Sequence, residues 1–379
     1  MPSLTHNTPA LRFPGYTGVW EQKQLEDVVT VYSGRDYKGI PAGNIPVYGT
    51  GGYMRSISQA LSDNNDAIGI GRKGTIDHPF ILKAPFWTVD TLFYCVPQHD
   101  YDLDFIYGLY QKVPWKALDE STGVPSLSKI AINHIKVLLP SLSEQRKIGS
   151  FFRHVDGLIN LHQRQTQTLK KLKQGLLQKM FPQDGESVPR LRFPGFTDTW
   201  KQQQLGNIAT FINGRAYSQD ELLEHGRYPV LRVGNFYTND SWYYSDLELA
   251  DKYYAHDGDL LYTWSATFGP HIWHGDTVIY HYHIWKIDLS HALNKLFALY
   301  LLEYDKNNLL ENHNGSTMVH ITKAGIENEI VLIPSDIQEQ KQIGSFFRTL
   351  DDLIHLHKQY VTTLIHLKKG LLQTMFPQD

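Results

Sequence analysis

Two stretches of the chain place apolar residues in alternating steps of three and four. The first stretch contains Ile148, Phe152, Val155, Ile159, Leu169, Leu176 and Met180. The second contains Ile343, Phe347, Leu350, Ile354, Val361, Leu364, Leu371 and Met375. A sustained stripe of this period is typical of a coiled-coil seam. We therefore predict two helices of about 37 residues, each about 55 Å long at ~1.5 Å per residue.

The two predicted helices are near copies of each other, so each is the obvious partner for the apolar stripe of the other. We expect them to pair as an antiparallel coiled coil. The alternative is that each helix packs only on its own domain. His162 and His357 take equivalent seam positions near the helix midpoints, where a polar residue can fix the register. A metal-binding or catalytic histidine pair would need further ligands, so we favour the structural interpretation.

The repeat extends beyond the helices and organises the whole chain. Residues 11–35 match residues 191–215, and residues 144–184 match residues 339–379. The chain is therefore a tandem duplication, with copies at 11–184 and 191–379 joined by 185–190. We expect four parts, which are a first recognition domain, a central helix, a second recognition domain and a C-terminal helix, at 1–143, 144–182, 183–338 and 339–379.

Outside the long helices the pattern changes to short strands bounded by Gly, Pro, Asn and Asp, which predicts an α+β fold. Strands are expected within residues 45–53, 66–76, 86–96 and 135–140. Residues 104–113 and 294–304 are expected to form one helix in each copy. Each copy then closes with a helix start followed by a strand, at 126–140 and 320–334.

Composition and motifs argue against an enzyme. The sequence contains no GxxxxGK[ST] phosphate loop, no HExxH zinc motif and no Asn/Asp-Pro-Pro-aromatic tetrapeptide. The glycines of "GTGGY" at 49–53 suit a turn better than a cofactor. Cys95 is the single cysteine, which rules out a disulfide framework and favours the cytoplasm. No run of apolar residues approaches the ~18 needed to cross a bilayer. We expect no cofactor and no metal in this chain.

Four histidines, at 271, 274, 281 and 283, are the one group that suggests a metal. They have no cysteine and no acidic partner at a recognisable spacing. His281 and His283 alternate with aromatic residues, so we interpret them as the polar face of a strand.

The remaining pattern suits nucleic-acid recognition through local clusters, since the net charge is −3. Arg72 and Lys73 stand between glycines, and an arginine in such a loop can contact guanine with two hydrogen bonds. Near a helix start, Ser126, Ser128 and Lys129 suit a phosphate. The full set of candidate DNA-binding residues is Arg35, Tyr37, Lys38, Arg72, Lys73, Thr75, Ser126, Ser128, Lys129, Arg215, Tyr217, Arg232, Asn235, Thr263, Ser265, Thr267 and Lys323. Each of these segments alone would pass for a solvated turn.

The difference between the copies favours recognition. The helices are nearly preserved, whereas the candidate loops, such as 66–75 and 258–269, have diverged almost completely. Two different reading surfaces on one duplicated scaffold suit an asymmetric DNA site in two parts. Ordinary divergence of loops would give the same picture.

The sequence resembles a specificity subunit of a type I restriction–modification system. The resemblance rests on "LLPSLSEQRKIGSFFRHVDGLI" and its second copy "LIPSDIQEQKQIGSFFRTLDDLI", on the junction "LLQKMFPQDGESVPRLRFPGF", and on "GVPSLSK" at 123–129. It covers nearly the whole chain, in order and twice. The second copy departs from the pattern at "NGSTMVHITK" (314–323), where the first has "TGVPSLSK".

The resemblance implies two target-recognition domains that each read one half of a split site in double-stranded DNA. It also implies that the two helices fix the spacing and bind two methyltransferase subunits. Those partners carry S-adenosylmethionine, and restriction subunits that translocate and cleave DNA use ATP and Mg²⁺. A different class of protein remains open on the residues alone, namely a coiled-coil scaffold whose two heads bind other proteins.

Overall fold

The computed structural model describes residues 7–183, 185–237, 239–265, 267–311 and 322–377, and for 307–311 the backbone alone. The chain forms two compact units. The first contains residues 1–164 and 358–379, and the second contains residues 165–357. Within the described part of the chain, no helix is long and apolar enough to span a membrane.

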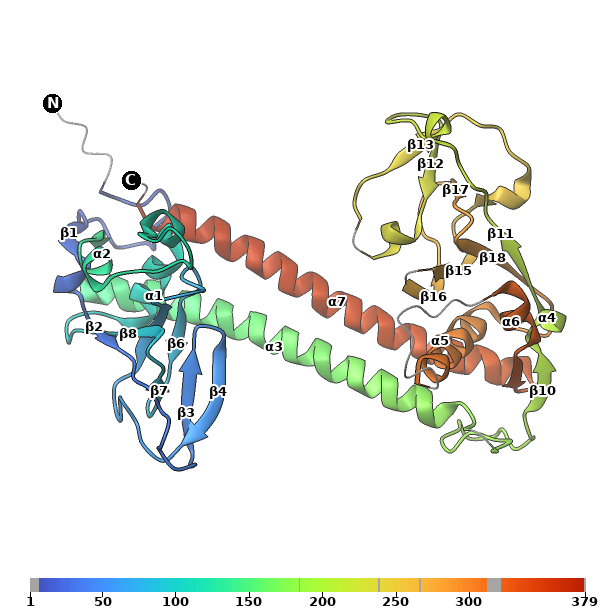
Figure 1. Ribbon diagram of the computed structural model, residues 1–379, viewed down its shortest axis with the longest axis horizontal. Coiled ribbons are helices and arrows are strands. Elements are labelled where there is room, and N and C mark those ends of the chain that lie inside the picture. The colour runs from blue at the N-terminus through green and yellow to red at the C-terminus, as the bar shows by residue number, and fades with distance from the viewer. Residues whose placement is uncertain (1–6, 184, 238, 266, 312–321, 378–379) are drawn as a thin grey trace. The chain divides into compact units, whose positions relative to one another are not determined.

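The two long predicted helices are present as α3 (Leu142–Met180) and α7 (Ile337–Met375), each of 39 residues (Figure 1). Each unit contains one part of each helix, and in both units the two parts run antiparallel. In the first unit Phe152 of α3 contacts Phe376, and His162 stacks on Tyr360 with ring centroids 4.9 Å apart. The partner number falls as the α3 number rises, which is the signature of antiparallel pairing. The prediction of a paired, antiparallel coiled coil is confirmed.

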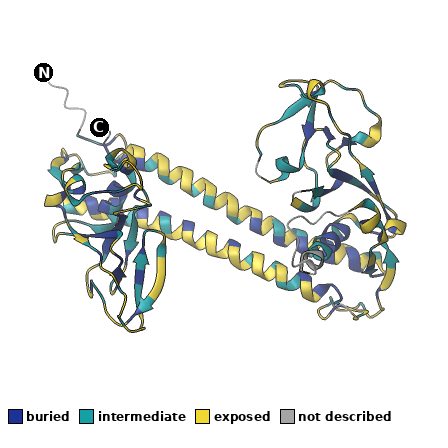
Figure 2. Cartoon of the chain, in the orientation of Figure 1, coloured by how far each residue is buried: buried dark blue, intermediate teal, exposed yellow. Residues whose placement is uncertain are grey.

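The seam agrees with the predicted stripe in its first half and shifts by one residue towards the helix ends. The predicted positions Ile148, Phe152, Val155 and Ile159 are buried, as are Ile343, Phe347, Leu350 and Ile354, whereas His162, Leu169, His357 and Leu364 are partly exposed. Near the ends, Leu177 and Leu372 are more buried than the expected Leu176 and Leu371. Near its end each helix packs against the core of a unit as well as against the other long helix. The contact with the core therefore determines which face of the helix is buried there. In Figure 2 the middle parts of α3 and α7 are coloured mainly as exposed.

The first unit combines two small sheets with a two-stranded ribbon. The larger sheet has the order β2-β8-β5-β6 (Val29–Ser33, Leu92–Pro97, Ala67–Gly71 and Phe80–Leu82). The second sheet is β4-β3-β7 (Gly52–Ile57, Ile45–Gly49 and Trp87–Thr88), and the ribbon pairs β1 with β9 (Glu21–Gln24 and Lys136–Leu139). The helices are α1 (Leu103–Lys112) and the short α2 (Lys129–Asn133). The "GTGG" segment forms the turn of the β3–β4 hairpin, as the sequence indicated.

The second unit repeats this plan. Its larger sheet has the order β11-β18-β15-β16 (Ala209–Asn213, Ile284–Leu289, Leu260–Ser265 and Thr267–Ile272). The second sheet is β13-β12-β17-β14 (Tyr243–Ser245, Tyr228–Leu231, Val278–Tyr280 and Tyr254–Ala255), and the ribbon pairs β10 with β19 (Lys201–Gln204 and Ile330–Ile333). The helices are α4 (Leu205–Ile208), α5 (Lys295–Glu311) and α6 (Lys323–Asn328). The α+β prediction is confirmed.

The repeated Glu-Gln-x-x-Ile-Gly motif explains how α3 attaches to the first unit. Glu144 is buried and accepts two hydrogen bonds of 2.6 Å from Arg12, which lies in the repeated "LRFPG" segment. The Gln145 side chain donates to the carbonyl of Pro140 and accepts from the amide of Asp102. A buried charge needs a partner of this kind, so the motif and the "LRFPG" segment depend on each other.

Gly149 allows α1 to approach the helix at this point. A Cβ on this residue would lie 2.2 Å from Oδ1 of Asp102. That carboxylate caps α1 by accepting from the amide of Phe105 at 2.9 Å. The motif therefore fixes α3 against α1, and it does so through contacts that only glycine permits.

The second unit builds the same joint. Glu339 accepts hydrogen bonds of 2.6 and 2.8 Å from Arg192, and Gln340 accepts from the amide of Asn294 at 2.8 Å. A Cβ on Gly344 would lie 2.7 Å from Cβ of Leu296. Because the joint is structural in both copies, its near identity reflects the fold and carries no information about DNA sequence.

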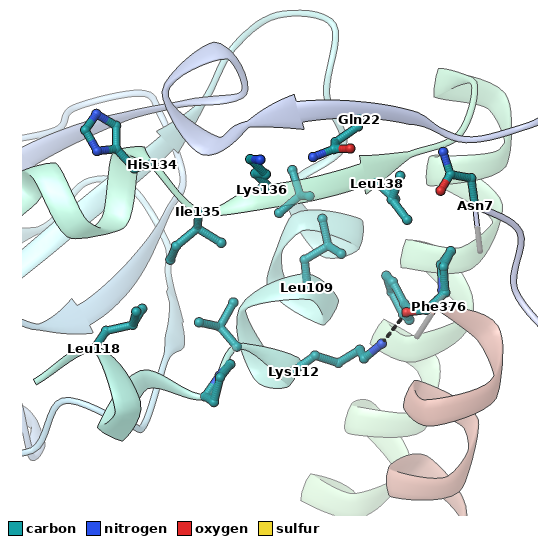
Figure 3. Close-up of a pocket in the computed structure, with 14 residues that line it drawn as sticks. Asn7, Gln22, Leu109, Lys112, Leu118, His134, Ile135, Lys136, Leu138 and Phe376 are labelled. Carbon is teal, nitrogen blue, oxygen red and sulfur yellow. Dashed lines mark hydrogen bonds between the residues drawn. The ribbon is translucent and has the colours of Figure 1, made fainter. Parts of the chain in front are cut away.

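The first unit also contains a cavity of about 590 Å³ between α1, the β1–β9 ribbon and the end of α7. Figure 3 shows Lys112 of α1 reaching the carbonyl of Pro377, a hydrogen bond of 2.9 Å. The equivalent cavity of the second unit has about 720 Å³ and is lined by Phe181 and Leu301 among others. These hollows recur where each long helix ends and belong to the preserved frame.

Candidate nucleic-acid interface

The first candidate surface begins at the end of β5, where the chain turns sharply after Gly71. A Cβ on Gly71 would lie 1.8 Å from the carbonyl oxygen of Thr75, so the turn requires glycine here. Gly74 has a φ of +96°, a left-handed conformation that side chains disfavour. These glycines hold Arg72 and Lys73 at the tip of the strand.

Two other segments come to this tip. The amides of Arg72 and Lys73 donate to the carbonyl of Thr91, in the turn between β7 and β8. On the other side, Leu127 donates to the carbonyl of Arg72, and Lys73 forms an isolated bridge with Ser126. Backbone hydrogen bonds therefore fix three segments that are remote in sequence.

The result is an open hollow of about 660 Å³. Five of the predicted DNA-binding residues lie in its lining, which consists of Ser33, Arg72, Lys73, Asp90, Thr91, Phe93, Ser126, Leu127, Ser128 and Lys129. The cationic groups of Arg72 and Lys129 lie 5.8 and 6.0 Å from the ring centroid of the buried Phe93. Three cations and several hydroxyls around one hollow make a surface that suits an anion such as a DNA phosphate.

The hydroxyls in the hollow have separate tasks. Ser128 Oγ accepts from the amide of Ala131 at 3.0 Å, so this serine caps α2. Ser126 is held by its own amide, which donates to the carboxylate of Asp119 at 2.9 Å. Ser126 is therefore the better placed of the two to offer its hydroxyl to a ligand.

The other predicted residues of the first unit lie outside this hollow. Arg35 and Lys38 are exposed after the end of β2. Tyr37 is half-buried, and the guanidinium of Arg55 lies 5.6 Å from its ring centroid. Thr75 is exposed between β5 and β6.

In the second unit, three strands end side by side and bring three basic residues together. Arg215 follows β11, Arg232 follows β12 and His281 follows β17. Arg215 and His281 form a parallel bridge, and the amide of His281 donates to the carbonyl of Leu231. Burial, followed by the nearby His283 and Arg232, lowers the pKa of His281 to about 4. This ring is therefore neutral at pH 7.

Much of the charge at these strand ends is already paired. Arg215 donates to both carboxylate oxygens of Glu221, at 2.5 and 3.0 Å, and its guanidinium lies 5.2 Å from the ring centroid of Tyr217. The ion pair lowers the pKa of Glu221 to about 2. Arg215 therefore braces the loop after β11 in this state of the protein.

Arg232 and Asn235 sit at the start of a separate loop. The Arg232 guanidinium lies 4.3 Å from the ring centroid of Tyr243. Asn235 accepts from the amide of Arg232 and donates to the carbonyls of Asn239 and Ser241. Asn235 thus shapes the loop from within. Arg232 is partly exposed, and its Nη2 donates to the carbonyl of Ser241 at 3.4 Å.

Within 258–269 we expected a strand that leads into a polar loop. The strand is present as β15, but most of the expected loop is the paired strand β16 of a hairpin. Thr263 is fully buried on β15, and its hydroxyl donates to the carbonyl of Gly269 at 3.2 Å. Ser265 and the exposed Thr267 lie at the hairpin end. Lys323 begins α6, where its ammonium lies 3.5 Å from the carboxylate of Glu327. The register of strand pairing, which the sequence does not specify locally, turns Thr263 inward.

The expectation of a histidine-bearing strand at 281–283 is wrong. β17 ends at Tyr280 and β18 begins at Ile284, so His281 and His283 lie in the turn between them. Among the residues that the structure describes, no three His, Cys, Asp or Glu residues are grouped to hold a metal ion.

The middle residue of this turn is a candidate that the sequence reasoning missed. Tyr282 is 39% exposed, and its equivalent in the first unit is Asp90 in the hollow. The equivalence follows from matching backbone hydrogen bonds. The amide of Arg35 donates to the carbonyl of Thr88, and the amide of Arg215 donates to the carbonyl of Tyr280, two residues before Asp90 and Tyr282 respectively. A comparison of "WTVDTLF" with "IYHYHIW" gives the same alignment, but the letters have too little in common to reveal it alone.

Comparison with known proteins assigns the chain to one family. The family model described as "Type I restriction modification DNA specificity domain" matches twice, over residues 18–171 and 197–364. A putative type I restriction enzyme MjaX specificity subunit from Methanocaldococcus jannaschii is 24% identical over 289 residues, which cover 71% of this chain and 64% of that protein. The MjaVIII specificity subunit of the same organism is also 24% identical, over 72% of this chain and 69% of its own length. The chain thus aligns with about two thirds of the length of these relatives.

The fold has a counterpart among solved structures. The crystal structure of a type I restriction-modification system S subunit from M. genitalium superimposes with a TM-score of 0.72. The superposition covers 98% of this chain and 100% of that one, at 15% sequence identity. The likeness therefore concerns the fold, including the two units and both long helices.

Proposed function

The chain belongs to the family of type I restriction modification DNA specificity domains, and from this we propose that it is the DNA-reading subunit of such a system. In this role each unit contacts one half of a split, asymmetric site in double-stranded DNA. The subunit itself carries out no chemistry. It acts where the cell's DNA lies, in the cytoplasm.

The observation that carries the proposal is the hollow at the tip of β5. Three cations converge there on one open surface, although the chain as a whole is slightly acidic. Lys73 and Lys129 suit phosphate oxygens, which supply most of the affinity and make it sensitive to salt. Arg72 can offer two parallel donors to a guanine edge in the major groove. The hollow therefore combines groups for affinity with a group for discrimination.

The remaining candidate residues of both units are proposed to flank the DNA. They are Arg35, Tyr37, Lys38 and Thr75 in the first unit, and Arg215, Tyr217, Arg232, Asn235, Ser265, Thr267 and Lys323 in the second. Thr263 is the exception, because it is buried. Its proposed task is to hold the β15–β16 hairpin in place.

The proposed partners are two methyltransferase subunits and, where the system restricts DNA, motor subunits that use ATP and Mg²⁺. The long helices offer matched apolar positions for two copies of one partner. Leu158 and Leu161 of α3 are 46% and 41% exposed, and their repeats Leu353 and Leu356 of α7 are 39% and 42% exposed. Leucines exposed in pairs at equivalent places favour a covered surface over a solvated one. S-adenosylmethionine would be bound by the methyltransferase, which modifies adenine.

The proposal is tested by expressing the chain together with the methyltransferase encoded beside it and mapping methylated adenines across the host genome. We expect one motif of two short defined parts separated by unspecified bases. Methylation that requires this chain but follows a continuous motif would contradict the assignment of one half-site to each unit. A complex that assembles but binds DNA with no sequence preference would favour the protein-binding scaffold.

A second experiment tests the proposed docking positions through the leucine pairs. The double variants Leu158→Lys with Leu161→Lys, and Leu353→Lys with Leu356→Lys, should each remove one methyltransferase subunit from the complex. Analytical ultracentrifugation measures the stoichiometry. Two subunits retained by both variants would contradict the proposed docking positions.

A further inference from the structure

The turn between β17 and β18 is the feature of the second unit that the sequence patterns did not explain. It comprises His281, Tyr282 and His283, and Tyr282 is its exposed middle residue. The three rings lie close together, with centroids 4.4 Å apart for His281 and Tyr282 and 3.9 Å apart for Tyr282 and His283. Tyr282 is exposed, whereas His281 and His283 beside it are partly buried. An aromatic ring that is held at the surface by its neighbours and carries a polar atom suits contact with a partner.

The same turn exists in the first unit at Val89, Asp90 and Thr91. In both units the first residue of the turn accepts the hydrogen bond that closes it, from Leu92 in one case and from Ile284 in the other. The exposed middle residue of the first turn, Asp90, lines the cationic hollow beside Arg72. The two turns therefore occupy one slot of the duplicated scaffold.

Each turn is tied to the end of the neighbouring hairpin. In the first unit the amides of Arg72 and Lys73 donate to Thr91. In the second unit Trp264 makes two bonds to the turn, from its amide to the carbonyl of His283 at 3.1 Å and from Nε1 to the carbonyl of Tyr282 at 3.0 Å. Both bonds use backbone acceptors, so they do not engage the Tyr282 hydroxyl, and the side chain stays 39% exposed although its ring contacts those of His281 and His283.

The charges have moved between the copies. In the first unit the cations lie on the hairpin side of the slot, at Arg72, Lys73 and Lys129. In the second unit the hairpin side holds Trp264, and the cation Arg232 lies on the other side, next to His281. The position equivalent to Arg232 in the first unit is Gly49, because His281 donates to Leu231 as Val89 donates to Tyr48. The turn at 281–283 bridges the two sides.

We propose that this turn is the base-reading element of the second unit, with Tyr282 entering a groove of the DNA and Arg232 anchoring an adjacent phosphate. The inference rests on the proposed function, since it names the residues that perform it in the second unit. A tyrosine offers an apolar ring edge and one hydroxyl, which suit a thymine methyl group or a single base-edge acceptor. The first unit, with Arg72 and Asp90, reads its half-site by charge-assisted hydrogen bonds instead. The two half-sites should differ in base composition for this reason.

The experiment compares three variants in the complete methyltransferase complex, namely Tyr282→Ala, Asp90→Ala and His274→Ala. The readout is the methylation rate on DNA duplexes that carry single base changes in either half-site. We expect Tyr282→Ala to lose about ten-fold in discrimination in the second half only. Asp90→Ala should relax the first half only. His274 lies on the turn after β16, at the opposite end of that hairpin, so His274→Ala should leave both halves unchanged.

Full discrimination in the second half by the Tyr282→Ala complex would overturn the inference. Relaxation of both halves together by this variant would also overturn it, because a damaged scaffold has that effect and a lost base contact does not. Arg232→Ala adds an independent readout. It should weaken binding to every duplex alike and lower the slope of log affinity against log salt by about one, whereas Tyr282→Ala should leave that slope unchanged.

The wild-type complex separates this inference from the proposed function. If it methylates a split motif while Tyr282→Ala discriminates like the wild type, the inference alone fails. If the wild-type complex shows no sequence preference, the proposed function fails, and the inference fails with it.

Discussion

Lys368 of α7 lies 2.6 Å from Asp156 of α3, and both side chains are largely buried, with 13% and 29% of their surface exposed. The repeat of this pair is Lys173 with Asp351, at 2.8 Å. Each unit therefore contains one lysine that crosses from one long helix to the other. Because a lysine must meet an acidic partner at this depth, the two pairs favour one antiparallel register over its neighbours.

We predict that Lys368 and Asp156 are coupled by about 1–2 kcal/mol in a double-mutant cycle with Lys368→Met and Asp156→Asn, since the pair lies between fully exposed and fully buried. The measurement is urea unfolding of the chain, followed for each pair by signals from the unit that contains it. A matched control is Arg348 with Asp352, an i,i+4 pair on α7 with side chains 39% and 61% exposed. Its coupling should be below ~0.5 kcal/mol. Equal coupling in both cycles would contradict a role for the crossing pair in register.

Gly149 and Gly157 provide a second test on one helix. Gly149→Ala places a methyl group 2.2 Å from the carboxylate that caps α1, whereas a Cβ on Gly157 meets nothing within 4 Å. We expect Gly149→Ala to lower the free energy of unfolding by about 1–3 kcal/mol. Gly157→Ala should raise it by up to about 1 kcal/mol, because alanine favours the helix. Denaturation midpoints of the two variants measure the difference, and midpoints that shift in the same direction would refute the proposed joint.

The sequence predicted the two long helices and the duplicated plan well, because both depend on local periodicity and on the internal repeat. The apolar stripe that includes Phe152 and Phe347 predicted two helices and their antiparallel pairing. The motif around Glu144 marked the start of α3. At Leu177 and Leu372 the buried position differs by one residue from the predicted stripe. Burial there depends on which part of the core lies opposite the helix, and the apolar period of a single helix contains no information about that neighbour.

The candidate site was predicted less completely, because it is assembled by non-local hydrogen bonds. Arg72 and Ser126 were predicted as separate candidates, each from its own segment. The structure brings both into one hollow through hydrogen bonds between backbone segments that are distant in sequence. Thr263 was expected on a loop but is turned into the core by the register of β15. Tyr282 was overlooked because the turn at 281–283 and its counterpart at 89–91 have no residue in common. They occupy the same position in the two units, but only the structure reveals this.

For the first unit we predict that Arg72→Ala with Lys73→Ala impairs recognition of one half-site only. Two lost cations should also lower the slope of log affinity against log salt by about two. Fluorescence anisotropy with the assembled complex, at several salt concentrations and on duplexes altered in either half, measures both effects. The control is Lys136→Ala, which removes an exposed lysine of β9 that lies outside the hollow and outside the candidate loops, and which should change affinity less. Equal relaxation of both halves by the double variant would contradict the assignment of the hollow to one half-site.

The pH dependence of the second unit provides the last test, through His271 on β16. Its Nε2 lies 2.9 Å from the Tyr237 hydroxyl, and Phe236 stacks on its ring at 4.2 Å. Burial, and then the nearby Lys306, lower the pKa of His271 to about 4. Between pH 6.5 and 4 the unfolded chain therefore binds a proton at this residue that the folded chain does not bind. The linkage relation then makes His271 neutral to stability above pH 6.5 and destabilising as the pH falls towards 4.

We expect the variant His271→Asn to lose less stability than the wild type between pH 7 and pH 5, by about 1–2 kcal/mol. Burial raises the pKa of Asp305 to about 7, which produces the opposite slope in both proteins, so the difference between variant and wild type is the quantity to compare. Urea midpoints at the two pH values measure it. His274→Asn, at a histidine whose side chain is 57% exposed, is the control and should follow the wild type. If His271→Asn also follows the wild type, the pKa of His271 in the folded unit is close to its value in the unfolded chain, and the burial of this ring is not the source of the pH dependence.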